Sequence, residues 1–259
     1  MKAIRLIISL VLFLNFISRM AAQDSIRSVL PLEKDTVVLP NDYALKSKRL
    51  IIPAAFITYG VGAMFNHELK DLNTSTRNEV VEDKPRRISL DNYTQYMPAV
   101  MVYGLNLAGV KGKHNFGDRT IIYATSQLMT AAVVLPLKHL VREERPDHSD
   151  NLSFPSGHTA TAFSSAQFLF REYKDSNLLL SLSGYPLALF TGIYRVVNNK
   201  HWIGDVATGA GIGIISTEVA YWMYPAISSI FHKKKESLST VVLPTYLQGS
   251  YGLTLVKVF

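Results

Sequence analysis

The residues best suited to chemistry in this chain are two histidines and an aspartate. His201 and Asp205 are four positions apart, so the carboxylate can accept a hydrogen bond from one imidazole nitrogen and leave the other nitrogen free to attack. His158 follows Pro155-Ser156-Gly157 at the start of an apolar segment, where an imidazole can exchange protons near neutral pH. Found alone, such a His–Asp pair is more often a surface or capping pair, and a histidine at a helix start is as often incidental.

Basic side chains accompany these three residues. Lys138, Arg142 and Arg145 have spacings of four and seven, which predicts one face of a helix. Cations on one face repel each other unless an anion or carboxylates neutralise them, although a solvated basic helix end is the commoner explanation of such a stretch. Arg195 adds a further cation six residues before His201. Together these residues indicate a site for an anion.

Ser156 and Gly157 are predicted to begin a helix. Serine is a preferred residue at a helix start, and glycine lets the backbone approach a ligand closely. The free amides and the positive dipole end of such a helix also favour an anion.

The elements that must position these residues are apolar segments rich in Ala, Leu, Ile, Val and Gly, which predict helices. The basic stretch ends the third segment, His158 opens the fourth, and His201 lies between the fifth and the sixth. In an up-and-down bundle those three places lie at the same end. The sequence therefore predicts an all-α, six-helix bundle, with segments at 50–66, 93–110, 119–141, 157–172, 178–196 and 202–225.

The other segments are predicted to be appendages of this bundle. Residues 67–92 are highly charged and predict a solvated excursion, whereas 240–247 and 251–259 alternate and predict strands around a turn at 248–250. The predicted divisions are an N-terminal segment at 1–22, a tether at 23–49, the helical domain at 50–231 and a basic, β-like tail at 232–259.

The N-terminal segment has the order of a secretory signal. Lys2 and Arg5 precede an apolar run from Leu6 to Ile17, and Ala21-Ala22 would be the cleavage site. An uncleaved anchor helix is the alternative. Basic residues gather at the non-catalytic end of the bundle, which by the positive-inside rule predicts an active site on the periplasmic side, in a protein embedded in or associated with the membrane. A cleaved signal followed by six membrane crossings would instead place the active site on the cytoplasmic side. The number of true membrane spans therefore stays open.

Overall composition narrows the partners. The formal net charge of +7 suits an anionic partner, and no nucleic-acid-binding module is evident. The absence of cysteine rules out a disulfide framework, thiol catalysis and cysteine metal sites. Oligomeric state is not encoded in any pattern that we recognise.

Three stretches in this order carry a family resemblance. Lys138-x6-Arg145-Pro146, then Pro155-Ser156-Gly157-His158, then Arg195-x5-His201-x3-Asp205 resembles the type 2 phosphatidic acid phosphatase (PAP2) superfamily, which includes bacterial acid phosphatases, lipid phosphatases and vanadium haloperoxidases. The motifs cover 138–205, and the helical pattern extends the likeness to about 50–231. Tyr194 stands where the family usually has serine.

The resemblance implies a phosphatase that needs no metal and no cofactor. His201 would form a phosphohistidine, Asp205 would orient it, and His158 would protonate the leaving oxygen and then activate water. The phosphate would be held by Lys138, Arg145, Arg195 and the Ser156-Gly157 helix start.

The apolar helices, basic surface and export signal favour a lipid-linked substrate such as undecaprenyl diphosphate, phosphatidic acid or a lipid A phosphate. Alternatives within the family are an acid phosphatase for soluble substrates and a vanadium-dependent haloperoxidase, because fold and motif do not fix the reaction. A non-catalytic binding protein is a further alternative, although every expected catalytic side chain is present.

Overall fold

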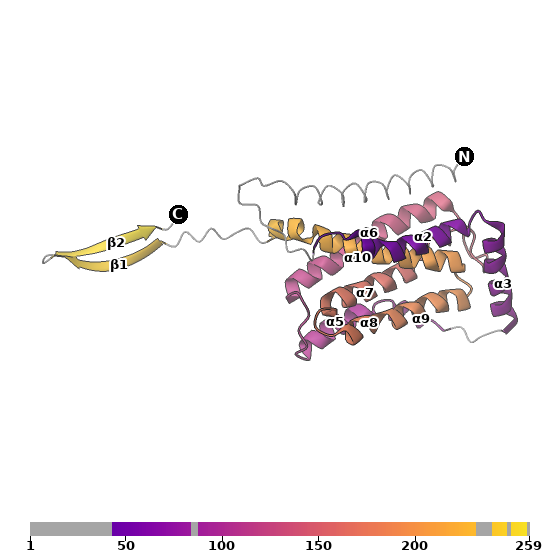
Figure 1. Cartoon of the computed structure of the whole chain (residues 1–259), viewed down its shortest axis with the longest axis horizontal. Coiled ribbons are helices and arrows are strands. Elements are labelled where there is room, and N and C mark those ends of the chain that lie inside the picture. The colour runs from indigo at the N-terminus through magenta and orange to yellow at the C-terminus, as the bar shows by residue number, and fades with distance from the viewer. Residues whose placement is uncertain (1–42, 84–87, 232–239, 248–249, 258–259) are drawn as a thin grey trace. The chain divides into compact units, whose positions relative to one another are not determined.

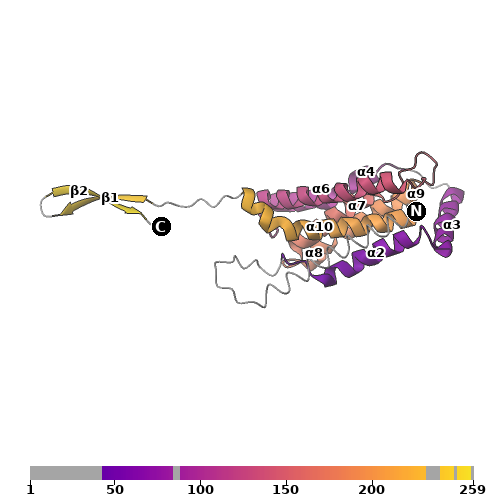
Figure 2. The same ribbon diagram turned by 90° about the horizontal axis from the view of Figure 1, so that it is seen from above.

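The long helices of this protein lie side by side, and α3 crosses their end (Figures 1 and 2). The computed structural model describes residues 43–83, 88–231, 240–247 and 250–257. All six predicted helical segments are present, the fifth divided in two. The bounds are η1 Ser47–Leu50, α2 Ile51–Gly62, α3 His67–Asp83, α4 Asp91–Thr94, α5 Met97–Leu107, α6 Phe116–Val141, α7 Gly157–Tyr173, α8 Leu178–Leu182, α9 Gly184–Val197 and α10 Ile203–Phe231.

Helix α7 is the central helix of the bundle, and most of its residues are buried. It lies against α5, α6, α9 and the short helices α4 and α8. Glycines bring α10 close to it: a Cβ on Gly209 would lie 2.5 Å from the Ser156 carbonyl oxygen, and one on Gly213 would overlap the Ala160 carbonyl oxygen. Small residues at such positions let two helix backbones approach closely. This contact places the start of α7 next to the start of α10.

The basic stretch does not form one helical face, so that prediction was wrong. Helix α6 ends at Val141, and Arg142 caps it in the left-handed conformation with φ 54°. The Arg142 side chain is exposed and donates from Nε to the carbonyl of His139. Lys138 therefore lies on the helix, whereas Arg145 lies in the connection to α7.

The predicted solvated excursion is largely helical, which corrects the sequence interpretation of residues 67–92. Helix α3 is bent by 87° from the preceding helical segment Ser47–Gly62. Two contacts tie it to the end of the bundle: Gly204 N donates to Asn73 Oδ1 at 3.4 Å, and Arg77 Nη2 donates to the Pro146 carbonyl at 3.2 Å. Most of α3 is exposed, but the segment after it returns into the bundle as α4.

The predicted tail strands are present as an antiparallel hairpin. Strand β1, Thr240–Leu247, pairs with β2, Ser250–Lys257, in a register that joins Thr240 to Lys257 and Leu247 to Ser250. The hairpin belongs to a second compact unit that begins at Ala226. The predicted signal at 1–22 and most of the tether at 23–49 lie outside the described residues.

Helix α6 has the length and composition of a membrane span. Its most apolar stretch is only 22% buried, and the bent pair Ser47–Gly62 and His67–Asp83 meets the same criteria if it counts as one span. The charge of Glu218 inside α10 is compensated, because Arg171 and Gln167 each donate to it at 2.6 Å. Since an uncompensated buried charge is costly, this pairing explains how α10 tolerates a carboxylate.

Candidate active site

The predicted pair of His201 and Asp205 is formed and buried. Nδ1 of His201 lies 3.4 Å from Oδ2 of Asp205, and the two side chains are 2% and 1% exposed. His201 precedes α10, whereas Asp205 lies in its first turn. Burial lowers the pKa of the His201 imidazole to about 4, and the hydrogen bond and the charge of Asp205 oppose that shift. The ring is therefore neutral at pH 7, with Nδ1 directed at the carboxylate and the lone pair left on Nε2.

Two further donors hold the Asp205 carboxylate. The Ser153 hydroxyl donates to Oδ2 at 2.5 Å and also lies 3.5 Å from His201 Nδ1, while the Trp202 amide donates to the same oxygen at 2.9 Å. Hydrogen bonds to a carboxylate favour its ionised form, so they lower the pKa of the Asp205 carboxyl group. The sequence did not identify Ser153, because its spacing to Asp205 carries no motif.

Lys138 and Arg145 lie beside this pair. Lys138 Nζ donates to the carbonyls of Leu152 and Ser153, at 2.6 and 3.3 Å. Arg145 pairs through Nε with Asp150 Oδ1 at 2.7 Å and donates from Nη1 to the Lys200 carbonyl, next to His201, at 3.3 Å. Both cations are thus anchored to the loops that carry the catalytic candidates.

Arg195 is buried near the end of α9 and pairs with a residue from the far segment α4. Its Nη1 donates to Asp91 Oδ2 at 2.7 Å. Its Nε is buried and has no hydrogen-bond partner within the described part of the chain. Because a buried donor without an acceptor is costly, this edge of the guanidinium suits an incoming anion.

The start of α7 meets the start of α10 main chain to main chain. The Ser156 amide donates to the Asp205 carbonyl at 3.1 Å, and the Ser156 side chain caps the helix by accepting from the Thr159 amide. The first intrahelical bond is from Ala160 N to Ser156 O, so the amides of Gly157 and His158 have no intrahelical partner. The Ser156 hydroxyl is thus occupied as a cap in this structure, and the described part of the chain offers no partner to the amides of Gly157 and His158.

His158 lies on the first turn of α7, and its Nε2 is 2.8 Å from Asn92 Oδ1 on α4. Burial lowers the pKa of the His158 imidazole to about 4; the charges of Arg195, Arg145 and Lys138 add to this shift, and that of Asp91 opposes it. Lys138 and Arg195 act on the imidazole of His201 as well. The structure therefore brings the predicted cations and both histidines to one end of the bundle.

A carboxyl group that the sequence did not single out adjoins Asp205. Glu143 is largely buried in the connection after α6, and its Oε2 finds no donor among the described residues. Burial, together with the negative charge of Asp205, raises the pKa of Glu143 to about 9. A protonated Glu143 can itself donate to Asp205, which explains why it needs no other donor. Only burial distinguishes it from the exposed Glu144 beside it in the sequence.

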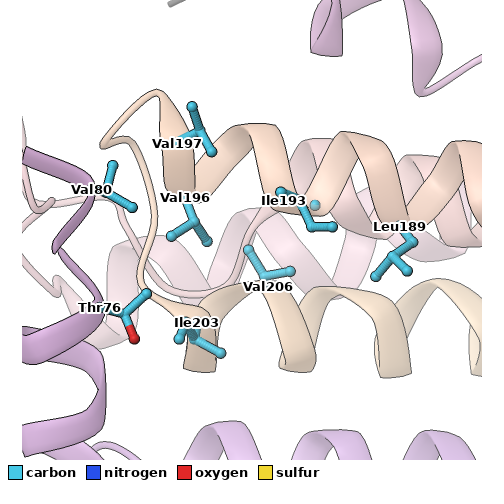
Figure 3. A pocket seen from close by; sticks show the side chains of 9 residues that line it. Thr76, Val80, Leu189, Ile193, Val196, Val197, Ile203 and Val206 are labelled. Atoms are coloured by element: carbon cyan, nitrogen blue, oxygen red, sulfur yellow. The ribbon is translucent and has the colours of Figure 1, made fainter. Parts of the chain in front are cut away.

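An apolar pocket lies between α3, α9 and α10 (Figure 3). Its volume is about 350 Å³. Val196 and Val197 follow Arg195 on α9, and Ile203 and Val206 lie on either side of Asp205 in the sequence of α10, so the pocket is built largely from the two helices that carry these site residues. The remaining lining comes from Thr76, Val80, Leu189, Gly192 and Ile193. The described residues hold no group of three or more His, Asp or Glu side chains arranged to bind a metal ion.

The fold and site define a helical bundle that carries a buried His–Asp pair and a cluster of cationic side chains at one end. Residues 119–229 match the PAP2 superfamily. The chain belongs to this superfamily. The three motifs, which span residues 138–205, lie within the matched region.

Two relatives and one solved structure illustrate the likeness. A lipid A 1-phosphatase of Porphyromonas gingivalis is 33% identical over 187 residues, which cover 67% of this chain and 42% of that protein. A lipid A 1-phosphatase of Helicobacter pylori is 27% identical, over 48% of this chain and 66% of that protein. The crystal structure of Aquifex aeolicus LpxE has a TM-score of 0.44 and 22% identity, covering 57% of this chain and 94% of that one. The chain thus spans about two fifths of the length of the first of these relatives.

Proposed function

We propose that this protein is a phosphatase that hydrolyses a phosphate ester of a lipid-linked substrate through a phosphohistidine. The observation that carries the proposal is the buried His201–Asp205 pair, because it leaves Nε2 of a neutral imidazole as a nucleophile beside fixed cations. The unpartnered Nε of Arg195 and the free amides at the start of α7 provide donors for phosphoryl oxygens.

In the first step, His201 Nε2 attacks phosphorus and the bond to the leaving oxygen breaks. The negative charge of the bound phosphate favours the protonated form of His158, which gives its proton to that oxygen, and Asp205 stabilises the positive charge that forms on the His201 ring. In the second step His158 takes a proton from water, the hydroxide oxygen bonds to phosphorus, and the P–N bond breaks to release phosphate. Lys138, Arg145 and Arg195 balance the phosphoryl charge throughout, so we propose that the reaction needs no metal ion.

A lipid substrate is supported by the pocket and by the exposed apolar surface. The aliphatic lining lies on α9 and α10, the helices that carry Arg195 and Asp205, and it suits a hydrocarbon chain attached to the phosphate. Large apolar side chains on α6, including Leu128 and Leu135, are exposed, which is typical of a surface that contacts a membrane. Two relatives are described as lipid A 1-phosphatases, so a phosphorylated lipid such as a lipid A phosphate leads the candidates, with undecaprenyl diphosphate and phosphatidic acid beside it.

We further propose that the active site faces the periplasm and that the protein is held in or on the membrane. The support is the sequence asymmetry of basic residues and the apolar helix α6. A reporter that is active only in the periplasm should be active when it is fused after residue 148. Activity at this position of a reporter that works only in the cytoplasm would contradict the periplasmic location of the active site.

Trapping of the phosphoenzyme tests the proposed function directly. Purified enzyme in detergent is mixed with ³²P-labelled lipid A, undecaprenyl diphosphate, phosphatidic acid or a soluble aryl phosphate, and quenched under conditions that preserve phosphohistidine. The wild-type protein and the exposed control His67→Ala should trap label, while His201→Ala should not. Label retained in His201→Ala would falsify the assigned nucleophile, and activity lost on chelation would contradict metal independence.

Halide oxidation with vanadate and peroxide, measured on the same preparations, separates the phosphatase from a haloperoxidase. Preference for the aryl phosphate over every lipid would favour the alternative acid phosphatase for soluble substrates.

A further inference from the structure

The short helix α4 brings two consecutive residues to two different groups of the site. Asp91 is buried and accepts from Arg195 Nη1 at 2.7 Å through Oδ2, and from Asn198 Nδ2 at 3.2 Å through Oδ1. Asn92, the next residue, lies with its Oδ1 at 2.8 Å from His158 Nε2. One segment thus contacts both a phosphate-binding candidate and the acid–base candidate.

The position of α4 is fixed by contacts that do not involve the reacting groups. Thr94 Oγ1 lies 2.8 Å from Thr191 Oγ1 on α9, and Gln95 Nε2 donates to the Asn92 carbonyl at 2.8 Å. The segment before it is held as well, because Asn198 Nδ2 donates to the Ile88 carbonyl at 2.9 Å. These bonds hold the backbone of α4, and with it the position from which the Asn92 side chain reaches His158.

We propose that Asn92 is a positioning residue for the proposed reaction: its amide oxygen accepts the proton on His158 Nε2, and thereby makes Nδ1 the nitrogen that exchanges protons with the substrate. This inference rests on the proposed function. A neutral amide oxygen accepts the same hydrogen bond from the imidazole and from the imidazolium, so it orients the ring in both steps. A carboxylate at this position would favour the charged ring and hold its proton more tightly.

The charges that face His158 come from four elements. Arg195 on α9, Asp91 on α4, Arg145 in the connection after α6 and Lys138 on α6 all act on its imidazole. Cations predominate in this set, and they ease the release of a proton to the leaving oxygen. Asparagine preserves that balance, whereas an aspartate would add a second negative charge from α4.

The test compares wild type with Asn92→Asp, Asn92→Ala and the control Asn78→Asp, which makes the same change at an exposed position on α3. Each is assayed in detergent from pH 4 to 10, with the lipid that the wild type hydrolyses fastest. We expect Asn92→Asp to move the alkaline limb of the kcat/KM profile upward by about one pH unit or more. We expect Asn92→Ala to lower kcat about tenfold to a hundredfold with KM nearly unchanged. Asn78→Asp should match wild type in both respects.

Because Asn92 is exposed, neither substitution endangers folding, and unfolding temperatures will verify this. An Asn92→Asp profile that superimposes on that of Asn78→Asp would overturn the inference, as would full kcat in Asn92→Ala. Those results leave the phosphatase proposal standing, since the wild type is active in both. A wild type that neither releases phosphate nor traps label would instead overturn the two proposals together.

Discussion

The hydroxyl of Ser153 donates a hydrogen bond of 2.5 Å to Oδ2 of Asp205, the same oxygen that faces Nδ1 of His201. Ser153 is fully buried and lies in the connection between α6 and α7, whereas Asp205 lies on α10. The loop before α7 therefore holds the carboxylate that faces His201, the proposed nucleophile.

Replacing Ser153 should weaken catalysis without weakening binding. In Ser153→Ala the carboxylate loses one of its donors, so we expect kcat to fall about tenfold with KM almost unchanged. Steady-state kinetics in detergent will measure this. Ser176→Ala, at the opposite end of α7, is the control and should behave as wild type. A rise in KM at constant kcat would mean that Ser153 contacts the substrate instead.

The burial of His201 should make stability depend on pH. Its pKa is about 4 in the folded protein and near 6.5 when exposed, so the unfolded chain binds more protons between these values. Stability is therefore complete above pH 6.5 and falls as the pH drops to about 4, by on the order of 2 kcal/mol. Unfolding midpoints of wild type and His201→Gln across this range will measure it. Parallel curves for the two proteins would contradict the effect.

The raised pKa of Glu143 predicts a stabilising substitution. Between its ordinary pKa of 4.5 and its folded value of about 9, the folded protein binds more protons, so the group lowers stability as the pH rises through this range. Glu143→Gln mimics the protonated form, and we expect a higher unfolding temperature at pH 8 and little change at pH 4.5. The exposed neighbour Glu144 provides the control Glu144→Gln, which should show no such pattern. Equal stability of Glu143→Gln and wild type at pH 8 would mean that the carboxyl is solvated.

The close contact of α7 and α10 predicts opposite effects for the same substitution at two glycines. Gly213→Ala places a methyl group against the Ala160 carbonyl and should destabilise the protein by about 2 kcal/mol or more. Gly104→Ala on α5 meets nothing within 4 Å, and should stabilise by about 0.5–1 kcal/mol because alanine favours the helix. Denaturant unfolding in detergent will compare them. A Gly213→Ala protein as stable as Gly104→Ala would contradict the packing.

The apolar pocket should matter only for substrates with a hydrocarbon chain. Leu189 lines it and is 54% exposed, so Leu189→Asn should raise KM for a lipid phosphate about tenfold and leave an aryl phosphate unaffected. Leu179→Asn changes an 82% exposed leucine on α8 and is the control. Equal kinetics of the two variants on the lipid would remove the pocket from the binding site.

The helices and the meeting of the motifs could be predicted because their signals are local. Long apolar segments, the Ser156 cap and the position of each motif at a helix end are sufficient to bring His158 and His201 to one end of a bundle. The roles assigned to the site residues stay predictions until kinetics test them.

The parts that could not be predicted depend on tertiary contacts. Arg142 caps α6 in the left-handed conformation without the glycine that usually marks such a cap, so helical spacing was wrongly applied to Arg142 and Arg145, although the predicted end of the segment at residue 141 was right. Asp91 and Asn92 lie in a charged stretch whose composition predicts exposure to solvent. Only the fold shows that Asp91 contacts Arg195 and that Asn92 contacts His158. Glu143 differs from Glu144 only in its burial, which no spacing encodes.

The main-chain hydrogen bond from Ser156 to Asp205 joins the starts of α7 and α10, which carry His158 and Asp205. Because α7 and α10 meet backbone to backbone there, with glycines in place of side chains, the helix starts that carry His158 and Asp205 are packed rigidly against each other. The outer wall of the pocket, by contrast, comes from α3, which lies across the bundle end through few contacts. If the proposed lipid tail binds in this pocket, sequence changes in α3 alter which tail fits while the packing of α7 against α10 stays intact.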